Sequence, residues 1–127
     1  MFSFSSDAKA PKDFRWENRI LICYNWEESS KTQVEALGNG FEERRLLYFG
    51  FNGEEIRESN FSGEIDESSF LQLRKNESVK WILIGLDGGV KAFGEQKPEI
   101  EEVFKTIDSM PMRQSEIRKR VKDGRNR

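Results

Sequence analysis

Histidine is absent from this chain, and cysteine occurs only once, as Cys23. A single cysteine excludes a disulfide within the chain. The absence of histidine removes the usual general base and the most common ligand of transition metals. Whole classes of enzyme are therefore excluded, and we expect neither a cofactor nor a metal centre.

Long apolar segments are also absent. No apolar run approaches the length of roughly 20 residues that a helix needs to cross a bilayer. Residues 1–12 contain no apolar core that could serve as a secretory signal. We therefore expect no membrane partner and, for the chain as written, a cytoplasmic location.

Aromatic and charged side chains are plentiful. Charged residues make up 35% of the 127 positions and aromatic residues 12%, with ten Phe and three Trp. This composition predicts one domain with a polar surface and a Phe-rich core. Residues 1–14 are predicted to be a flexible leader, residues 15–112 the domain, and residues 113–127 a basic C-terminal helix or tail.

Four segments are typical of strands. Residues 19–26 and 45–51 are continuous apolar runs, as expected of buried strands in a parallel pair. Residues 79–86 form a third run, and the Asp-Gly-Gly sequence that follows favours a tight turn. We therefore expect residues 90–93 to return antiparallel to the third strand as a hairpin.

Three helices are expected between and after these strands. Ser29 or Ser30 is predicted to cap the first, with Gln33 completing a capping box. Asp66 is predicted to open the second helix. The third, residues 98–107, has four apolar side chains at the spacing of one buried helix face: Ile100, Val103, Phe104 and Ile107.

The resulting order, β-α-β-α-β-β-α, combines two parallel crossovers with a terminal hairpin. It predicts an α/β, thioredoxin-like fold with a four-stranded mixed sheet in the order 2-1-3-4, whose fourth strand is antiparallel. In such a sheet the strand of residues 46–51 lies at an edge. An edge strand could pair with a protein partner or with a second copy of the chain.

Four segments occur in the order seen in a known family of domains: residues 15–19, 43–49, 85–91 and 107–114. They resemble the P-DUDES domain, a domain of unknown function shared by bacterial proteins and by the vertebrate Dro/Urb, Drs, Equarin and sushi-repeat proteins. The resemblance spans roughly residues 14–118. It implies a thioredoxin-like fold, a proposed antioxidant role and, for many members, export from the cell. The positions that carry the family motif are Arg15, Trp16, Asp87, Gly88, Gly89, Lys91, Asp108, Met110, Pro111, Met112 and Arg113.

The segment after the first strand decides the redox chemistry of a thioredoxin-like fold. A helix N-terminus at this position lowers the pKa of the nucleophilic thiol. Here residues 26–30 read Trp-Glu-Glu-Ser-Ser and contain no thiol. Residues 76–79, which lead into the third strand, also lack the proline of a cis-proline loop. The sequence therefore predicts no dithiol catalysis.

Cys23 lies earlier, inside the first apolar strand. Burial raises the pKa of a thiol and hides it from oxidants, so we favour a structural core residue. The alternative is a one-cysteine antioxidant enzyme that uses Cys23 to reduce peroxide.

Other conspicuous patterns have structural explanations. The Asp-Gly-Gly sequence at 87–89 lacks the glycine spacing of a P-loop and is typical of a hairpin turn. The clustered glutamates follow no calcium-loop pattern. Trp16, Trp26 and Trp81 are expected in the core rather than as exposed ligand anchors.

The C-terminal segment is basic, with seven such side chains: Arg113, Arg118, Lys119, Arg120, Lys122, Arg125 and Arg127. No aromatic side chain lies among them, so we expect a solvated helix rather than a nucleic-acid surface. The sequence as a whole favours a non-catalytic binding or stress-related accessory module.

Overall fold

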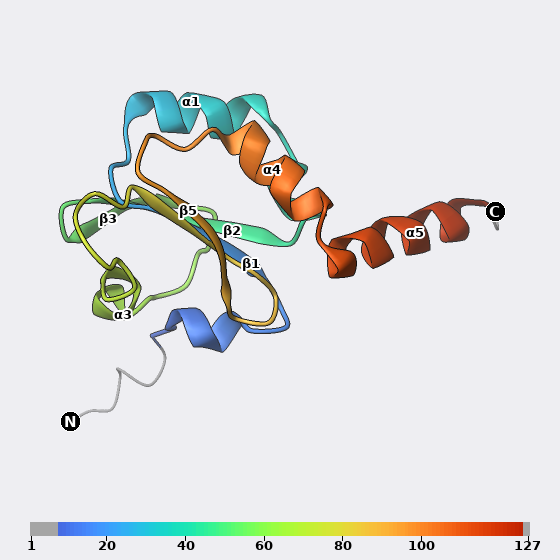
Figure 1. The fold of residues 1–127 in the computed structure, drawn as a ribbon, viewed down its shortest axis with the longest axis horizontal. Helices are drawn as coiled ribbons and strands as arrows, with labels where there is room; N and C mark the ends of the chain where they lie inside the picture. Colours follow the sequence, from blue (N-terminus) through green and yellow to red (C-terminus); the bar gives the residue numbers. More distant parts are fainter. Residues whose placement is uncertain (1–7, 126–127) are drawn as a thin grey trace.

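The computed structural model describes residues 8–125. Its strands are β1 (Arg19–Cys23), β2 (Leu46–Asn52), β3 (Glu55–Ser59), β4 (Trp81–Ile84) and β5 (Val90–Gly94). Its helices are the short 3-10 helix η2 (Pro11–Phe14), α1 (Glu28–Ala36), α2 (Gly40–Glu43), α3 (Glu67–Leu71), α4 (Ile100–Asp108) and α5 (Pro111–Arg125). The predicted α/β class is confirmed (Figure 1).

The strands form one mixed sheet in the order β3-β2-β1-β4-β5. β1 and β2 are parallel, as predicted, and β4 and β5 form the predicted antiparallel hairpin. However, β4 also pairs antiparallel with β1, with Leu21 opposite Leu83. The expected second parallel crossover is therefore wrong, and so is the expectation that only the last strand runs antiparallel.

The additional strand β3 explains the direction of β4. After β2 the chain turns back at once, and Asn52 of β2 lies opposite Glu55 of β3. Gly53 makes this turn possible with a φ of 68°, a left-handed conformation that glycine adopts without strain. The hairpin adds one reversal, so the segment containing α3 brings the chain to the opposite end of the sheet before β4 begins.

The same hairpin removes β2 from the edge of the sheet. β3 pairs along β2, and the two edge strands are β3 and β5. The prediction that residues 46–51 form an edge strand open to a partner is therefore wrong. Gly53 was the available signal, because glycine is favoured at the first position of a two-residue hairpin turn.

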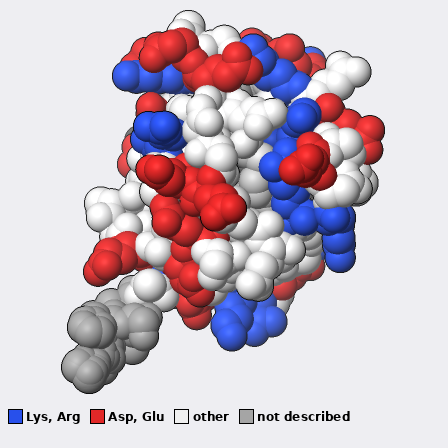
Figure 2. Space-filling view, turned by 90° about the vertical axis from the view of Figure 1, so that its left-hand side faces the viewer, with Lys and Arg blue, Asp and Glu red and all other residues white. Residues whose placement is uncertain are grey.

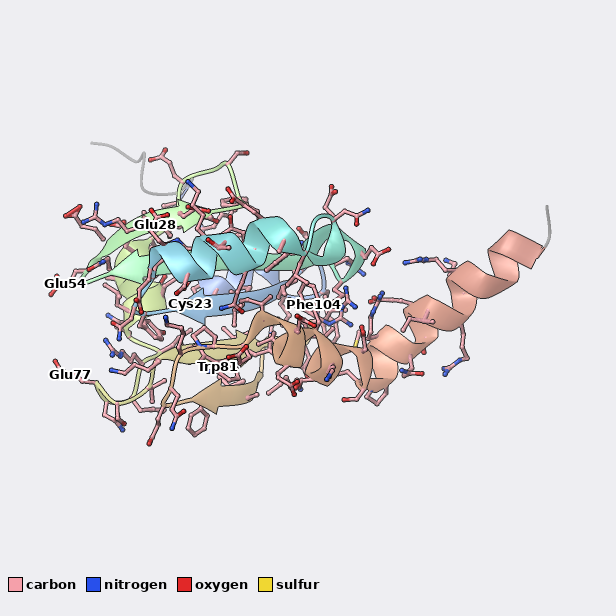
Figure 3. The ribbon with its side chains drawn as sticks, turned by 90° about the horizontal axis from the view of Figure 1, so that it is seen from above. Cys23, Glu28, Glu54, Glu77, Trp81 and Phe104 are labelled. Atoms are coloured by element: carbon pink, nitrogen blue, oxygen red, sulfur yellow. The ribbon has the colours of Figure 1, made fainter. Side chains whose placement is uncertain are left out.

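Helices cover the two faces of the sheet differently. α1 and α4 lie side by side over one face, and α3 lies below the other (Figures 1 and 3). Under α4, the buried side chains of Phe104 and Ile107 join the cluster that contains Leu21 and Leu83. The predicted buried face of the helix is confirmed, because all four of its apolar side chains are buried.

The start of α1 differs from the prediction. The helix begins at Glu28 and no side chain caps it, while Ser30 already lies within the helix and is buried. The predicted capping box does not form, because the Gln33 side chain binds the start of another helix. Its Oε1 accepts a hydrogen bond of 3.0 Å from the backbone N of Ile100, the first residue of α4.

The segments at the two predicted domain boundaries also pack against the fold. Lys9 forms a β-bridge with Ile65, and the Phe14 ring is buried, edge-on to Phe61. At the other end, Arg113 of α5 is buried. The division of the chain after residues 14 and 112 stays a prediction, but contacts of the described residues cross both boundaries. Residues 1–7 of the predicted leader lie outside the described part.

Candidate functional site

The loop from β1 to α1 carries carboxylates and hydroxyls. Trp26 is buried there and stacks on Tyr48 with ring centroids 5.2 Å apart. Lys97 Nζ lies 3.5 Å from Glu27 Oε2 and donates a hydrogen bond of 2.8 Å to Ser29 Oγ. Figure 2 faces this end of the molecule, where acidic side chains gather near the middle of the view. The loop contains no cysteine and so has no sulfur atom that could act as a nucleophile.

Cys23 lies inside the sheet, between Gly50 of β2 and Trp81 of β4. It is 1% exposed and forms no disulfide. Burial raises the pKa of its thiol from 9.0 to about 12. The thiol is therefore protonated at neutral pH and shielded from solvent, which agrees with the core interpretation.

At the opposite end of the sheet, three segments that are distant in sequence meet. β1 begins there, β4 ends there, and α4 joins α5 there. A groove of about 320 Å³ lies between them. Five of the predicted motif residues line it: Asp87, Lys91, Met110, Pro111 and Met112. Three residues of the lining were not predicted as site residues: Arg19, Gly85 and Leu86.

The hairpin turn beside the groove is held by its own side chains. Asp87 Oδ1 accepts a hydrogen bond of 2.9 Å from the Gly89 backbone N, and its Oδ2 accepts one of 2.7 Å from Lys91 Nζ. The Lys91 bond, aided by the Gly89 bond, lowers the pKa of Asp87. These contacts support the interpretation of residues 87–89 as turn chemistry.

Arg15 and Trp16 reach the same turn from the segment before β1. The Trp16 backbone N donates a hydrogen bond of 2.6 Å to the Leu86 carbonyl. A Cβ at Gly88 would lie 3.2 Å from Arg15 Cδ, so glycine leaves room for the arginine. The core position predicted for Trp16 is wrong, because its side chain is 59% exposed. It sits in a turn with a φ of 70°, outside the sheet.

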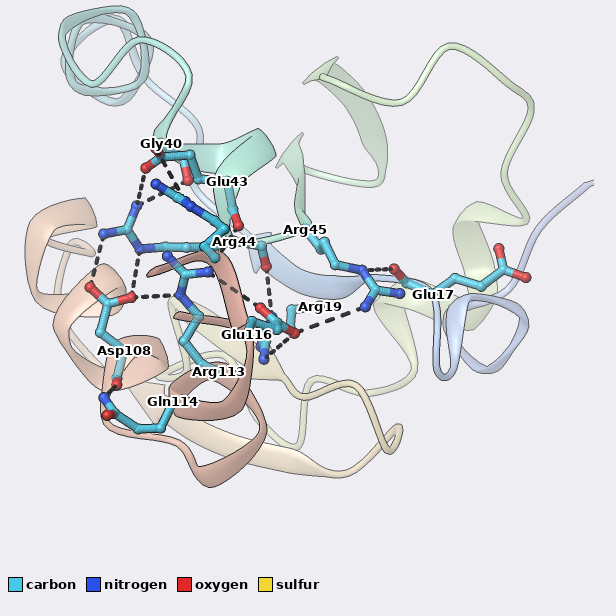
Figure 4. Close-up of polar contacts among 11 residues, drawn as sticks. Glu17, Arg19, Gly40, Glu43, Arg44, Arg45, Asp108, Arg113, Gln114 and Glu116 are labelled. Atoms are coloured by element: carbon cyan, nitrogen blue, oxygen red, sulfur yellow. Dashed lines mark hydrogen bonds and ion pairs between the residues drawn. The ribbon is translucent and has the colours of Figure 1, made fainter. Parts of the chain in front are cut away.

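Next to the groove, arginines bind the carboxylates of α4 and α5 (Figure 4). Arg44 Nε and Nη2 donate hydrogen bonds of 3.0 and 2.9 Å to the two oxygens of Asp108, and Arg113 Nε adds one of 3.0 Å. Burial alone would raise the pKa of Asp108, but the bonds from Arg44 and Arg113 outweigh it and lower the pKa. Asp108 therefore stays ionised and joins α4 to two other segments.

Arg19 is the most deeply buried charged side chain, at 1% exposure. Its Nη1 donates a hydrogen bond of 2.8 Å to the Arg44 carbonyl. Nη1 and Nη2 also donate longer bonds of 3.4 and 3.3 Å to Glu116. Within the described part of the chain, its Nε has no hydrogen-bond partner.

Arg19, Arg44 and Glu116 were not predicted as site residues. A signal for Arg19 existed, because side chains two residues apart in a strand point to the same face. Arg19 therefore shares a face with Leu21 and Cys23, in a run that is otherwise apolar. Such a buried charge needs partners from other elements, and those partners cannot be identified from the strand itself.

The basic C-terminal segment is only partly a solvated helix. Arg113 is buried among Asp108, Glu116 and the Glu43 carbonyl. Further along α5, Arg120 Nη1 lies 3.6 Å from Glu43 Oε1 and is mostly exposed. The start of the helix is thus bound to the domain, while Arg120 keeps the exposed character predicted for the segment.

Among the residues that the structure describes, no three His, Cys, Asp or Glu side chains gather where they could hold a metal ion. No helix of this part is both long and apolar enough to cross a membrane.

Fold and site together define an α/β domain with one buried cysteine and no disulfide. The chain belongs to the family described as a domain of unknown function, DUF4174, whose sequence profile matches residues 11–116. This range contains every residue of the groove. It also contains the arginine cluster, which consists of Arg19, Arg44, Asp108, Arg113 and Glu116. No curated protein matches the chain, and no solved structure matches it.

Proposed function

We propose that this chain is a thioredoxin-like domain of the P-DUDES type that works without dithiol catalysis, as a small binding or stress-related accessory module. The strand order β2-β1-β4-β5, with helices over both faces, supports the thioredoxin-like assignment. The four segments that resemble P-DUDES all lie within residues 11–116. The stress-related role follows from that resemblance.

The burial of Cys23 carries this proposal. The thiolate, not the thiol, is the nucleophile. Burial raises the pKa of this thiol to about 12, so nearly all of it is protonated at pH 7. The helix N-terminus that activates a thiol in redox members of the fold is occupied here by Glu27 and Glu28, which disfavour an anion.

The groove at the start of β1 is our candidate for the binding site. It is lined by motif residues from two segments, and Arg15 and Trp16 of a third lie beside it. Its size is near the lower limit of ligand pockets, about 300–1,000 Å³. It lies at the end of the sheet opposite the loop after β1, so binding there is independent of thiol chemistry.

The test measures the reactivity of Cys23. We expect alkylation of the folded protein to be slow and to follow the unfolding equilibrium, with full reactivity only in denaturant. We also expect neither peroxide consumption nor insulin reduction at a catalytic rate, with the same result for Cys23→Ala. Peroxide turnover that disappears in Cys23→Ser would overturn the proposal in favour of the one-cysteine enzyme.

A further inference from the structure

We infer that the groove binds a small organic carboxylate with an apolar body, its head group directed at Arg19 and at the N-terminus of α5. This inference rests on the proposed binding role of the groove and adds the chemical class of the ligand. Two independent observations carry it: an Nε without a hydrogen-bond partner on a buried arginine, and amides at the start of a long helix that have no acceptor within that helix.

The first observation is the state of Arg19. Its side chain lines the groove, is almost fully buried, and has an Nε without a hydrogen-bond partner among the described residues. An unsatisfied donor on a buried cation costs free energy. Its contacts with Glu116 are long, at 3.3 and 3.4 Å, so the guanidinium charge is only partly compensated. A ligand oxygen would satisfy the Nε–H.

The second observation is the start of α5, which has 15 residues. The bond of 2.9 Å from the Gln114 N to the Met110 carbonyl marks its first turn. Met112 and Arg113 come before Gln114 in the chain, so their N–H groups have no acceptor within the helix. Pro111 has no N–H to donate. Met110, Pro111 and Met112 all line the groove, so the positive end of the helix dipole is at the groove.

The charges of the lining favour a head group with one negative charge. Lys91 is already paired with Asp87 at 2.7 Å, so these two side chains largely cancel. Arg19 then provides the remaining cationic donor, through one N–H. A carboxylate matches one donor and two backbone amides, whereas a phosphate dianion would bring an additional charge close to Asp87.

The rest of the groove favours an apolar body. Leu86, Met110, Pro111 and Met112 offer hydrocarbon and thioether surface. Arg19 Nε is itself buried, so we expect the head group to reach it when side chains of the lining, which include Met110 and Met112, move aside. Methionine allows this, because its unbranched side chain has three rotatable bonds. The volume of about 320 Å³ suits a short-chain or phenylalkyl carboxylate.

The test is a calorimetric titration of the folded protein with hexanoate and with 3-phenylpropionate. Hexanamide, which keeps the apolar body but has no charge, and inorganic phosphate serve as comparison ligands. We expect each carboxylate to bind at least about tenfold more tightly than the amide or phosphate, equivalent to ~1.4 kcal/mol. Equal affinities, tighter phosphate binding or no carboxylate binding up to about 10 mM would overturn the inference.

Two variants locate the site. Met112→Glu puts a carboxylate in the first turn of α5, where the helix dipole favours it, so the protein should fold and the new side chain should compete for the anion position. Phe93→Glu makes a matched apolar-to-Glu change at a 60% exposed residue of β5 outside the groove. We expect about tenfold weaker carboxylate binding for Met112→Glu and less than about twofold for Phe93→Glu. An equal effect of both variants would contradict the proposed site.

A third variant tests the Nε donor. Arg19→Lys keeps the charge but removes this N–H, and we expect carboxylate binding to weaken by about tenfold. A thermal unfolding curve of each variant tests whether the variant is folded. Failure of carboxylate binding with an unreactive Cys23 overturns only this inference, whereas catalytic turnover at Cys23 overturns the proposed function itself.

Discussion

At the end of the sheet where β1 stops, Glu27, Ser29 and Lys97 make exposed contacts. At the end where β1 starts, Arg19 and Arg113 are buried and bound to carboxylates of α4 and α5. In Figure 3, Glu28 and Cys23 lie toward the first end, and α5 leaves from the other. In the thioredoxin-like fold that we propose for this chain, redox members would hold their thiol at the first end, and the second end would have no part in that chemistry.

The difference shows which end constrains the structure. An exposed ion pair such as Lys97–Glu27 contributes little, because water solvates both partners almost as well. A buried arginine, in contrast, must be compensated by groups from several elements, and removing one partner leaves a charge unpaired. We therefore expect substitutions to be tolerated after β1 and to be costly at the start of β1.

The largest effect is expected for Arg19→Ala. The change removes the most buried cation of the described residues, leaves a cavity and takes one of three arginine partners from Glu116. We expect the free energy of unfolding to fall by about 3 kcal/mol, measured by urea denaturation. The control is Lys31→Ala, an exposed position near the start of α1, with a change within about 0.5 kcal/mol. Similar losses in both variants would remove the contrast between the ends.

Alkaline pH tests the first end through Cys23. The unfolded thiol ionises near pH 9.0, but the folded thiol has a pKa of about 12, so its contribution to stability is lost as pH rises between these values. The slope from this group is at most about 1.4 kcal/mol per pH unit. Urea denaturation at about pH 8 and about pH 10 measures it.

Two comparisons make this pH test specific. Cys23→Ala should show a smaller loss between the two pH values than the unchanged protein. A residual loss is expected from Tyr48, because burial and the hydrogen bond to Glu58 raise its pKa from 10.0 to about 12. An identical pH dependence in Cys23→Ala would show that the thiol ionises normally in the folded protein.

Gly88→Ala tests the turn at the second end. Gly88 has a φ of 86°, and a Cβ there would lie 3.2 Å from Arg15 Cδ. We expect a loss of about 1 kcal/mol in thermal or urea unfolding. Gly89→Ala is the matched control, because a Cβ at Gly89 meets only ordinary contacts and should cost less. A larger loss for Gly89→Ala would show that the turn is held differently.

The smallest effect is expected for Lys97→Ala at the first end. The Lys97 and Glu27 side chains are 46% and 55% exposed, so their ion pair contributes less than about 0.5 kcal/mol. The shift in melting temperature should be correspondingly small. A loss of more than about 1 kcal/mol would mean that this loop is as constrained as the arginine cluster.

Local patterns predicted much of the fold. The runs at 19–26 and 45–51, the hairpin of β4 and β5, and the buried face of α4 are confirmed, because each depends on periodicity or turn residues within one segment. The predicted direction of β4 was wrong. The direction of a strand depends on how often the chain has reversed before it, and the unrecognised hairpin of β2 and β3 adds one reversal. The capping of α1 was wrong because Gln33 bonds to α4 rather than to its own helix.

Less of the candidate site could be predicted. Five motif residues were identified by resemblance, and the structure brings them together at one groove: Asp87, Lys91, Met110, Pro111 and Met112. Arg19, Arg44 and Glu116 were missed, because an arginine in a strand or a glutamate in a helix has no local signature of burial. Their partners lie up to 97 residues away in the chain.

By itself, the sequence determined the α/β class, the Phe-rich core and the exclusion of a disulfide within the chain, because composition and short-range periodicity depend only on neighbouring residues. Only the tertiary structure decided that Cys23 lies between two strands, that β4 opposes β1, and that Arg19 reaches the junction of α4 and α5. Burial and charge pairing are properties of segments far apart in the chain, so they arise only when the sheet and its helices assemble.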